Sequence, residues 1–174
     1  VDMYASSEAE LPNGVSLSVT SGLPESGRVR VAVTKAEKPF TLRLRIPRWA
    51  CADGRSYYET HENVTAGAVF EKEFPFDFRV TRYTGGEEIK GKERYAVEYG
   101  PLLFAAMGAP NPVTVRFNPA APSAWFTPVK QMMPGGSVLR LKLKGDRMHE
   151  YRAYMDIHDE PFDVYPIVEA PAEE

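Results

Sequence analysis

Apolar and polar residues alternate with a period of two along much of the chain. The clearest case is the segment Phe40–Ile46, in which every second residue is a large apolar one and the residues between are Thr or Arg. Because successive side chains of a strand point to opposite faces, this segment predicts a strand with one apolar and one basic face. Pro47 ends the predicted strand, since it lacks the backbone N–H that a sheet ladder needs.

Similar runs recur, separated by turn residues such as those of Pro12-Asn13-Gly14. Alternation predicts strands over residues 15–20, 28–34, 69–80, 95–99, 139–143 and 153–157, with shorter ones at 113–117 and 162–168. Residues 102–107 are continuously apolar, which predicts a strand buried on both faces. Many short strands between turns predict an all-β protein, an antiparallel, jelly-roll-like β-sandwich with few or no helices. Residues 55–67 and 109–134 otherwise show no clear period.

The length and composition fit one globular domain. The chain has 174 residues, of which 43% are hydrophobic and 26% charged, and it shows no internal repeat. We therefore expect residues 1–174 to form a single β-sandwich domain that ends in the acidic tail 169–174. Its core is expected to combine the aromatic face of Phe74, Phe76 and Phe78 with the apolar run 102–107. Because the first residue is Val1 and not Met, we expect the chain to be either a mature product or a piece excised from a longer protein.

Charge and hydropathy exclude two classes of partner. The net charge of −3 and the pI near 5.7 provide no basic excess, so nucleic acid is not an expected partner. No apolar run approaches the roughly 20 residues that cross a bilayer, so a membrane is not an expected partner either. Cys51 is the single cysteine and cannot form an internal disulfide.

Three motifs follow one another in an order that resembles glycoside hydrolase family 127, which is typified by β-L-arabinofuranosidases. They are LRIPRWA at residues 44–50, FPF at 74–76 and YAVEYGPLLF at 95–104. The opening YASSEA, at residues 4–9, is similar to the junction at which the family's last barrel helix gives way to its C-terminal β-sandwich. The resemblance covers roughly residues 4–107. One family motif, R-x-W-x-x-G-D, is not evident between Ala52 and Phe70.

The resemblance implies a non-catalytic role for this chain. In the family, a zinc-bound cysteine nucleophile and a glutamate acid/base lie in an (α/α)6 barrel, which these residues do not contain. Cys51 lies outside any cysteine motif of the family, so no catalytic residue, metal ligand or cofactor is expected here. The expected role is that of an accessory β-sandwich domain whose partner is the missing N-terminal barrel of a glycoside hydrolase. The parent would be periplasmic or secreted if it degrades polysaccharide, and cytoplasmic otherwise.

A carbohydrate-binding module is the alternative function. An indole or phenyl face presents apolar area to the C–H groups of a sugar ring. Trp125 and Phe126 lie in a proline-rich segment, and Trp49 directly follows the strand 40–46. For Trp49, packing against the core is the favoured interpretation. The sequence specifies neither the sugar nor the oligomeric state.

An independent enzyme is the third hypothesis, and it needs ionisable groups that converge in a pocket. The adjacent pairs Glu87-Glu88 and Asp159-Glu160 do not face each other across the roughly 5 to 9 Å that glycoside cleavage requires. Asp156 and His158 share a face of the predicted strand 153–157 and its continuation, but they lack distant partners for a metal site.

One further charged feature is the basic face of the strand 40–46. Arg43, Arg45 and Arg48 carry guanidinium forks that match a carboxylate. A solvated or salt-bridged sheet face is the favoured interpretation, since neighbouring strands commonly supply opposite charges.

Overall fold

The computed structural model describes residues 1–86, 89–108, 112–133 and 136–171. Within these ranges the chain consists of β-strands and three 3-10 helices of three residues each, which confirms the all-β prediction. The chain divides into two compact units, residues 1–77 and 78–174 (unit 1 and unit 2). The pair Glu87-Glu88 and the end of the predicted acidic tail, residues 172–174, lie outside the described residues.

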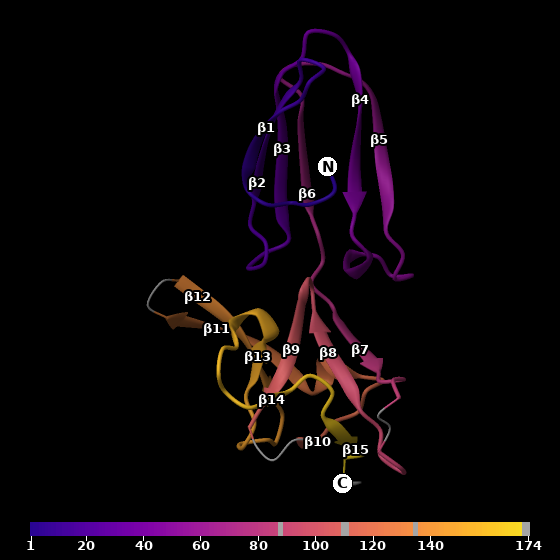
Figure 1. Ribbon diagram of the computed structural model, residues 1–174, viewed down its shortest axis with the longest axis vertical. Helices are drawn as coiled ribbons and strands as arrows, with labels where there is room; N and C mark the ends of the chain where they lie inside the picture. The colour runs from indigo at the N-terminus through magenta and orange to yellow at the C-terminus, as the bar shows by residue number, and fades with distance from the viewer. Residues whose placement is uncertain (87–88, 109–111, 134–135, 172–174) are drawn as a thin grey trace. The chain divides into compact units, whose positions relative to one another are not determined.

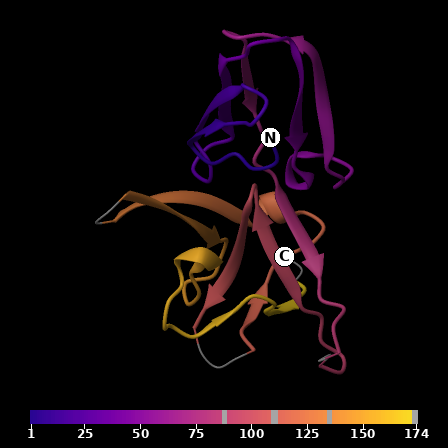
Figure 2. The ribbon, with the colours of Figure 1, turned by 45° about the horizontal axis from the view of Figure 1, so that its top comes forward.

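Unit 1 is a sandwich of two antiparallel sheets (Figures 1 and 2). The larger sheet has the order β1-β2-β3-β6, with β1 at Ser7–Glu10, β2 at Ser16–Ser21, β3 at Arg28–Lys35 and β6 at Val69–Glu73. The smaller sheet pairs β4 (Phe40–Ile46) with β5 (Tyr57–Val64). The apolar face predicted for residues 40–46 is confirmed, because Leu42, Leu44 and Ile46 are buried together with alternate valines of β3.

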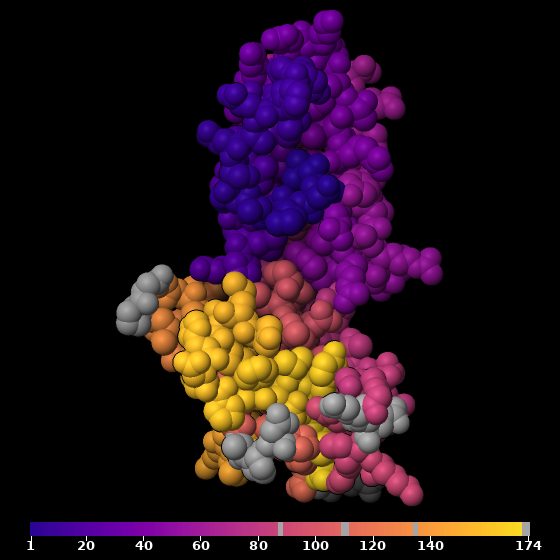
Figure 3. Space-filling model, in the orientation of Figure 1, coloured from indigo at the N-terminus to yellow at the C-terminus, as the bar shows by residue number. Residues whose placement is uncertain are grey.

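The N-terminal segment of unit 1 joins its two sheets. The amino group of Val1 donates to the Arg43 carbonyl at 2.6 Å, and the Arg45 N–H donates to the Val1 carbonyl at 3.0 Å. The Tyr4 hydroxyl donates to the Arg45 carbonyl at 2.7 Å. The chain then enters β1, which pairs with β2 of the other sheet, and this segment covers one face of unit 1 in Figure 3. Burial, followed by the charges of Glu59 and Asp2, raises the pKa of Tyr4 to about 12.

Unit 2 is built on a seven-stranded sheet with the order β11-β12-β13-β9-β8-β7, in which β14 also pairs with β9. These strands are β7 (Phe78–Arg82), β8 (Tyr95–Tyr99), β9 (Leu102–Met107), β11 (Phe126–Met133), β12 (Gly136–Leu143), β13 (Tyr151–Ala153) and β14 (Phe162–Asp163). A separate pair, β10 (Thr114–Arg116) with β15 (Ile167–Glu169), runs parallel and departs from the predicted antiparallel pattern. Burial on both faces of the run 102–107 is confirmed, since Phe104, Ala105 and Ala106 are fully buried.

A buried carboxylate positions the parallel pair. Asp163 accepts the N–H of Val113 at 3.1 Å and that of Tyr165 at 2.9 Å, and it lies 3.5 Å from the Arg94 guanidinium. Val113 precedes β10 and Tyr165 precedes β15, so one side chain holds the starts of both strands. Its burial is tolerated because hydrogen bonds and an opposite charge satisfy it.

The strand predicted over residues 69–80 is wrong as one element. β6 ends at Glu73 and β7 begins at Phe78, and the two strands belong to different sheets in different units. Pro75 lies between them and cannot donate to a ladder. As a result Phe74 is buried in the core of unit 1, whereas Phe78 packs against that of unit 2, so the expected common aromatic face does not form.

Three strands were not predicted, and two predicted strands have other bounds. β1 is exposed at every position, so it has no apolar face that would indicate it. The predicted strand 162–168 consists of two separate strands, β14 and β15. β5 and β11 lie in the segments without clear periodicity, because β5 carries polar residues on both faces and β11 contains Pro128. The predicted strand 153–157 ends at Ala153, where the 3-10 helix η3 (Tyr154–Asp156) begins. Its apolar member Met155 is 65% exposed rather than inward-facing.

Whether unit 1 and unit 2 unfold as the single predicted domain is a thermodynamic question. Leu44 and Phe104, both fully buried, report on the core of unit 1 and of unit 2. Truncation of a buried Leu or Phe to alanine costs about 2–5 kcal/mol. If residues 1–174 are one domain, the chain unfolds in urea in one transition, which circular dichroism follows. Leu44→Ala and Phe104→Ala should then each lower the urea concentration at the midpoint of that one transition. Two transitions, each sensitive to only one of the substitutions, would contradict the single-domain prediction.

The raised pKa of Tyr4 makes stability depend on alkaline pH. A phenol that ionises near pH 10 when unfolded and near pH 12 when folded favours the folded state while it is neutral. This contribution is complete below pH 10 and is lost as the pH rises towards 12. We expect Tyr4→Phe to make the fall in unfolding free energy over this range shallower, as measured by urea titration at each pH. Tyr57→Phe, at a side chain 53% exposed, is the matched control; an equal slope for wild type and Tyr4→Phe would refute the assignment.

Candidate functional site

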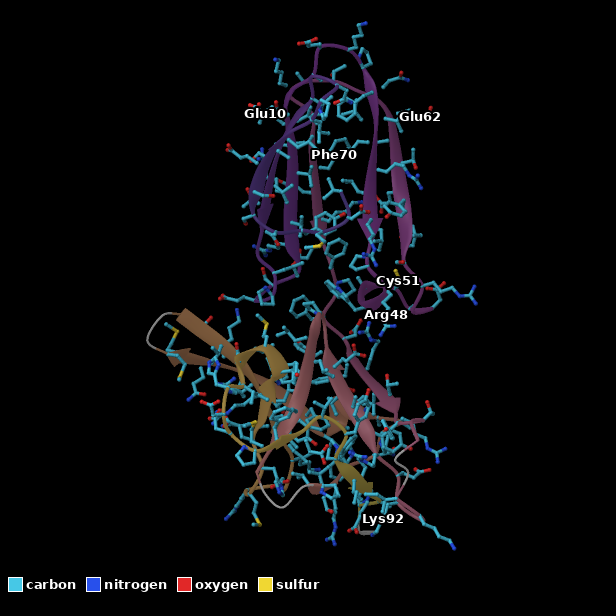
Figure 4. The ribbon with its side chains drawn as sticks, in the orientation of Figure 1. Glu10, Arg48, Cys51, Glu62, Phe70 and Lys92 are labelled. Carbon is cyan, nitrogen blue, oxygen red and sulfur yellow. The ribbon has the colours of Figure 1, made fainter. Side chains whose placement is uncertain are left out.

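Trp49 is a packing residue at the end of β4. It lies in the 3-10 helix η1 (Arg48–Ala50), which Cys51 follows; Figure 4 labels Arg48 and Cys51. The centroid of its ring lies 5.5 Å from that of Phe74 and 5.7 Å from that of Phe76, both in edge-to-face geometry. The side chain packs against the core of unit 1. This geometry agrees with the packing interpretation, because edge-to-face contacts stabilise aromatic pairs in cores.

Trp125 and Phe126 occupy different environments although they are adjacent. Phe126 is 2% exposed and contacts Phe117 and Tyr151 in the core of unit 2, so its ring has no free face for a sugar. Trp125 is half-buried at the end of the 3-10 helix η2 (Pro122–Ala124), with the Lys144 ammonium 5.7 Å from its ring. Of the two, only Trp125 leaves aromatic surface accessible, and sugar contact there stays a prediction.

A half-buried charged cluster joins β5 to β6, which belong to different sheets of unit 1. Lys72 of β6 donates to Glu59 of β5, and His61 Nε2 lies 3.7 Å from the same carboxylate. The His61 ring also stacks on Phe70 at 4.5 Å, and Figure 4 shows Phe70 between the sheets. Sequence reasoning missed this cluster because these positions of β5 carry polar residues where a sandwich strand normally carries apolar ones.

The three arginines of the β4 region stay at the surface. The Arg43 guanidinium lies 4.6 Å from the centre of the Tyr58 ring, which is cation–π geometry, and the Tyr58 hydroxyl donates to Asp2. Across the described parts of the chain, Arg43, Arg45 and Arg48 form no ion pair. The arrangement fits a solvated sheet face rather than a carboxylate clamp.

The candidate ligand groups near His158 do not assemble. Asp156 lies in η3 and accepts a hydrogen bond from Arg140 at 3.3 Å, while His158 is exposed, so the two do not share a strand face. In the residues that the structure describes, no group of three or more His, Cys, Asp or Glu side chains is placed to hold a metal ion. None of the described helices has the length and apolarity to cross a membrane.

Cys51 lacks the surroundings of a reactive thiol. Its Sγ donates to the Pro47 carbonyl at 3.3 Å, and burial, followed by the charge of Asp53, raises its pKa. A reactive cysteine needs the opposite environment, in which a nearby cation or helix N-terminus stabilises the thiolate.

Unit 2 carries a cleft of about 770 Å³ beside β11, β12 and the loop of residues 145–150. At its base Arg140 is 8% exposed, 3.1 Å from Glu150 and 3.3 Å from Asp156. The cleft rim also includes a hydrogen-bonded pair, since His149 Nδ1 lies 2.8 Å from Asp146. Although burial alone would raise it, the pKa of Asp146 is lowered by the hydrogen bonds it accepts from the side chain and backbone of His149 and from Met148.

Comparison with known proteins identifies the N-terminal part of the chain. Residues 1–65 match the family model described as the middle domain of the GH127 β-L-arabinofuranosidases. This range contains β1 to β5 and therefore most of unit 1. No curated protein matches the chain in sequence.

Solved structures with the same fold include three glycoside hydrolases. One, described only as a glycoside hydrolase, has a TM-score of 0.63 and 15% identity over 92% of this chain and 34% of its own. A GH127 β-arabinofuranosidase has a TM-score of 0.62 and 17% identity over 94% of this chain and 34% of its own. The GH127 β-L-arabinofuranosidase Ara127N from Geobacillus stearothermophilus T6 has a TM-score of 0.60 and 16% identity over 96% of this chain and 33% of its own.

These matches agree with the motifs at residues 44–50, 74–76 and 95–104. The chain spans about a third of the length of the solved structures that it matches. The resemblance predicted from the motifs is thereby confirmed: the chain has the fold of the β-sandwich region of family 127 proteins, and its residues 1–65 match the middle domain of that family.

Proposed function

We propose that this chain is a non-catalytic accessory region of a larger, family 127-like glycoside hydrolase and that it braces the catalytic domain of that protein. The observation that carries the proposal is the coverage of the structural matches. Glycoside hydrolases match this chain over 92% of its length or more, yet the matched part is only about a third of each. The other two thirds of each relative leave room for a separate catalytic domain.

The charged residues support a role without catalysis. Glycoside cleavage uses two carboxyl groups about 5 to 9 Å apart on either side of the scissile bond. Several carboxylates of the described residues are instead paired with cations. Glu98 pairs with Arg79 at 2.9 Å and Glu59 with Lys72, both across strands, and Glu150 pairs with Arg152 of the same segment at 2.9 Å. These carboxylates therefore face cations rather than a second carboxyl group.

Exposed apolar side chains on unit 2 are candidates for the contact with a catalytic domain. Met132 is 80% exposed, and Met155 and Tyr154 of η3 are also largely exposed. Methionine and aromatic side chains are enriched in protein interfaces, and their apolar surface costs free energy while it faces water. We propose that these residues lie against the catalytic domain.

The proposal predicts a structural contribution and no turnover. The purified chain should not hydrolyse p-nitrophenyl β-L-arabinofuranoside, whereas the full parent protein should. Deleting the residues of this chain from the parent should lower the melting temperature of the catalytic domain by about 4 °C or more, equivalent to roughly 1–2 kcal/mol. Differential scanning calorimetry measures the shift. Turnover by the isolated chain, or an unchanged melting temperature, would rule the proposal out.

The same role predicts no response to neutral arabinan fragments. Trp125 is the partly accessible aromatic of the predicted sugar-binding set, so its fluorescence reports on the alternative function as a carbohydrate-binding module. Titration with arabino-oligosaccharides to millimolar concentration should leave the emission of the wild type and of Trp125→Phe unchanged. A saturable change in the wild type that Trp125→Phe abolishes would favour the binding module over the bracing role.

A further inference from the structure

The cleft of unit 2 is lined by consecutive residues of β11 and β12, which belong to both faces of these strands, and by residues 146–150. In β12, Leu141 and Leu143 are buried in the core, so the alternate residues Arg140 and Lys142 point to the other face. Arg140 is paired with Val129 of β11 across the ladder, and both line the cleft.

Cations outnumber carboxylates around this cleft. Lys130, Lys142 and Arg147 line it and are exposed, and none of them forms an ion pair with another described residue. Lys130 stands opposite Leu139 in the ladder and therefore lies on the other face of the β11–β12 pair from Lys142. Arg140 adds a fourth cation at the base. This excess is local, because the chain as a whole has a net charge of −3. A positive cleft on a negative protein attracts and retains anionic ligands.

The carboxylates in the cleft restrict the kind of anion. Asp146 and Glu150 line the same space as the lysines, and Glu150 is shared between Arg140 and Arg152. They repel a densely charged phosphate chain but accept hydrogen bonds from hydroxyl groups. Because Asp146 engages His149 Nδ1, the imidazole has Nε2 left for a ligand.

We propose that this cleft binds an acidic oligosaccharide, with uronate carboxylates on Lys142 and Arg147 and sugar hydroxyls on Glu150 and His149. Lysine and arginine form strong charge-assisted hydrogen bonds with carboxylates, and arginine can bind both oxygens. The volume of about 770 Å³ lies in the range of roughly 300–1,000 Å³ typical of small-ligand sites and accommodates one or two sugar rings. This activity goes beyond the bracing role and does not depend on it.

Binding of tri-galacturonic acid to the purified chain tests the proposal. Isothermal titration calorimetry should detect saturable binding that weakens as the salt concentration rises, because salt screens exposed charges. The double variant Lys142→Gln/Arg147→Gln should bind at least about tenfold more weakly, since it loses two charge-assisted hydrogen bonds. Lys38→Gln is the matched control, because Lys38 is exposed on unit 1 and should not affect binding. Circular dichroism verifies that all variants are folded.

Two further ligands show whether the cleft selects an acidic sugar or binds any sugar or any simple anion. Arabinotriose, which is neutral, should not bind, and inorganic phosphate at the same concentration should not displace the trisaccharide. The proposal is overturned if tri-galacturonic acid does not bind at millimolar concentration or if the double variant binds it like the wild type. Equal binding of arabinotriose, or displacement by equimolar phosphate, would overturn it as well.

Discussion

The packing of β4 against β3 is the constraint on which unit 1 depends. The β4–β5 pair is a separate sheet, and along β4 its backbone bonds to the N-terminal segment rather than to the larger sheet. Apolar contact must therefore hold the β4–β5 pair against the larger sheet. Val31, Val33 and Leu44 provide this contact and are almost completely buried. Burying each such side chain contributes about 1.5–3 kcal/mol. A polar contact also joins the two sheets, because Lys72 of β6 donates to Glu59 of β5. This contact adds nothing to the apolar core.

In unit 2, a buried carboxylate attaches the smaller sheet to the larger one. Its central strand β9 is buried on both faces, and Asp163 ties the β10–β15 pair to the sheet through backbone hydrogen bonds. Charged side chains such as Arg140 and Arg152 are left on the face away from the core, where they form a network with Glu150. The result is a charged surface whose carboxylates are paired with arginines.

The sequence predicts the parts of this fold in which one face of a strand is apolar. β4 matches its predicted bounds because its alternation is strict. β5 was missed because Glu59 and His61 stand at its half-buried positions, where Glu59 pairs with Lys72 of β6 and the His61 ring lies against Phe70 of β6. The break at Pro75 was missed because alternation continues across it while the chain changes sheets. For the sites, the packing interpretation of Trp49 followed from its place after β4. The cleft of unit 2 depends instead on residues 146–150, which line it together with β11 and β12, and no local pattern encodes that arrangement.

Alternating burial gives each unit of this chain a core of its own, so the isolated chain should fold stably. Amide hydrogen exchange of the isolated chain, resolved by residue with NMR, measures this stability. The amides of β3, β4 and β9 should exchange most slowly, at rates set by global unfolding. Exchange of these amides at the rate of an unstructured chain would contradict this prediction.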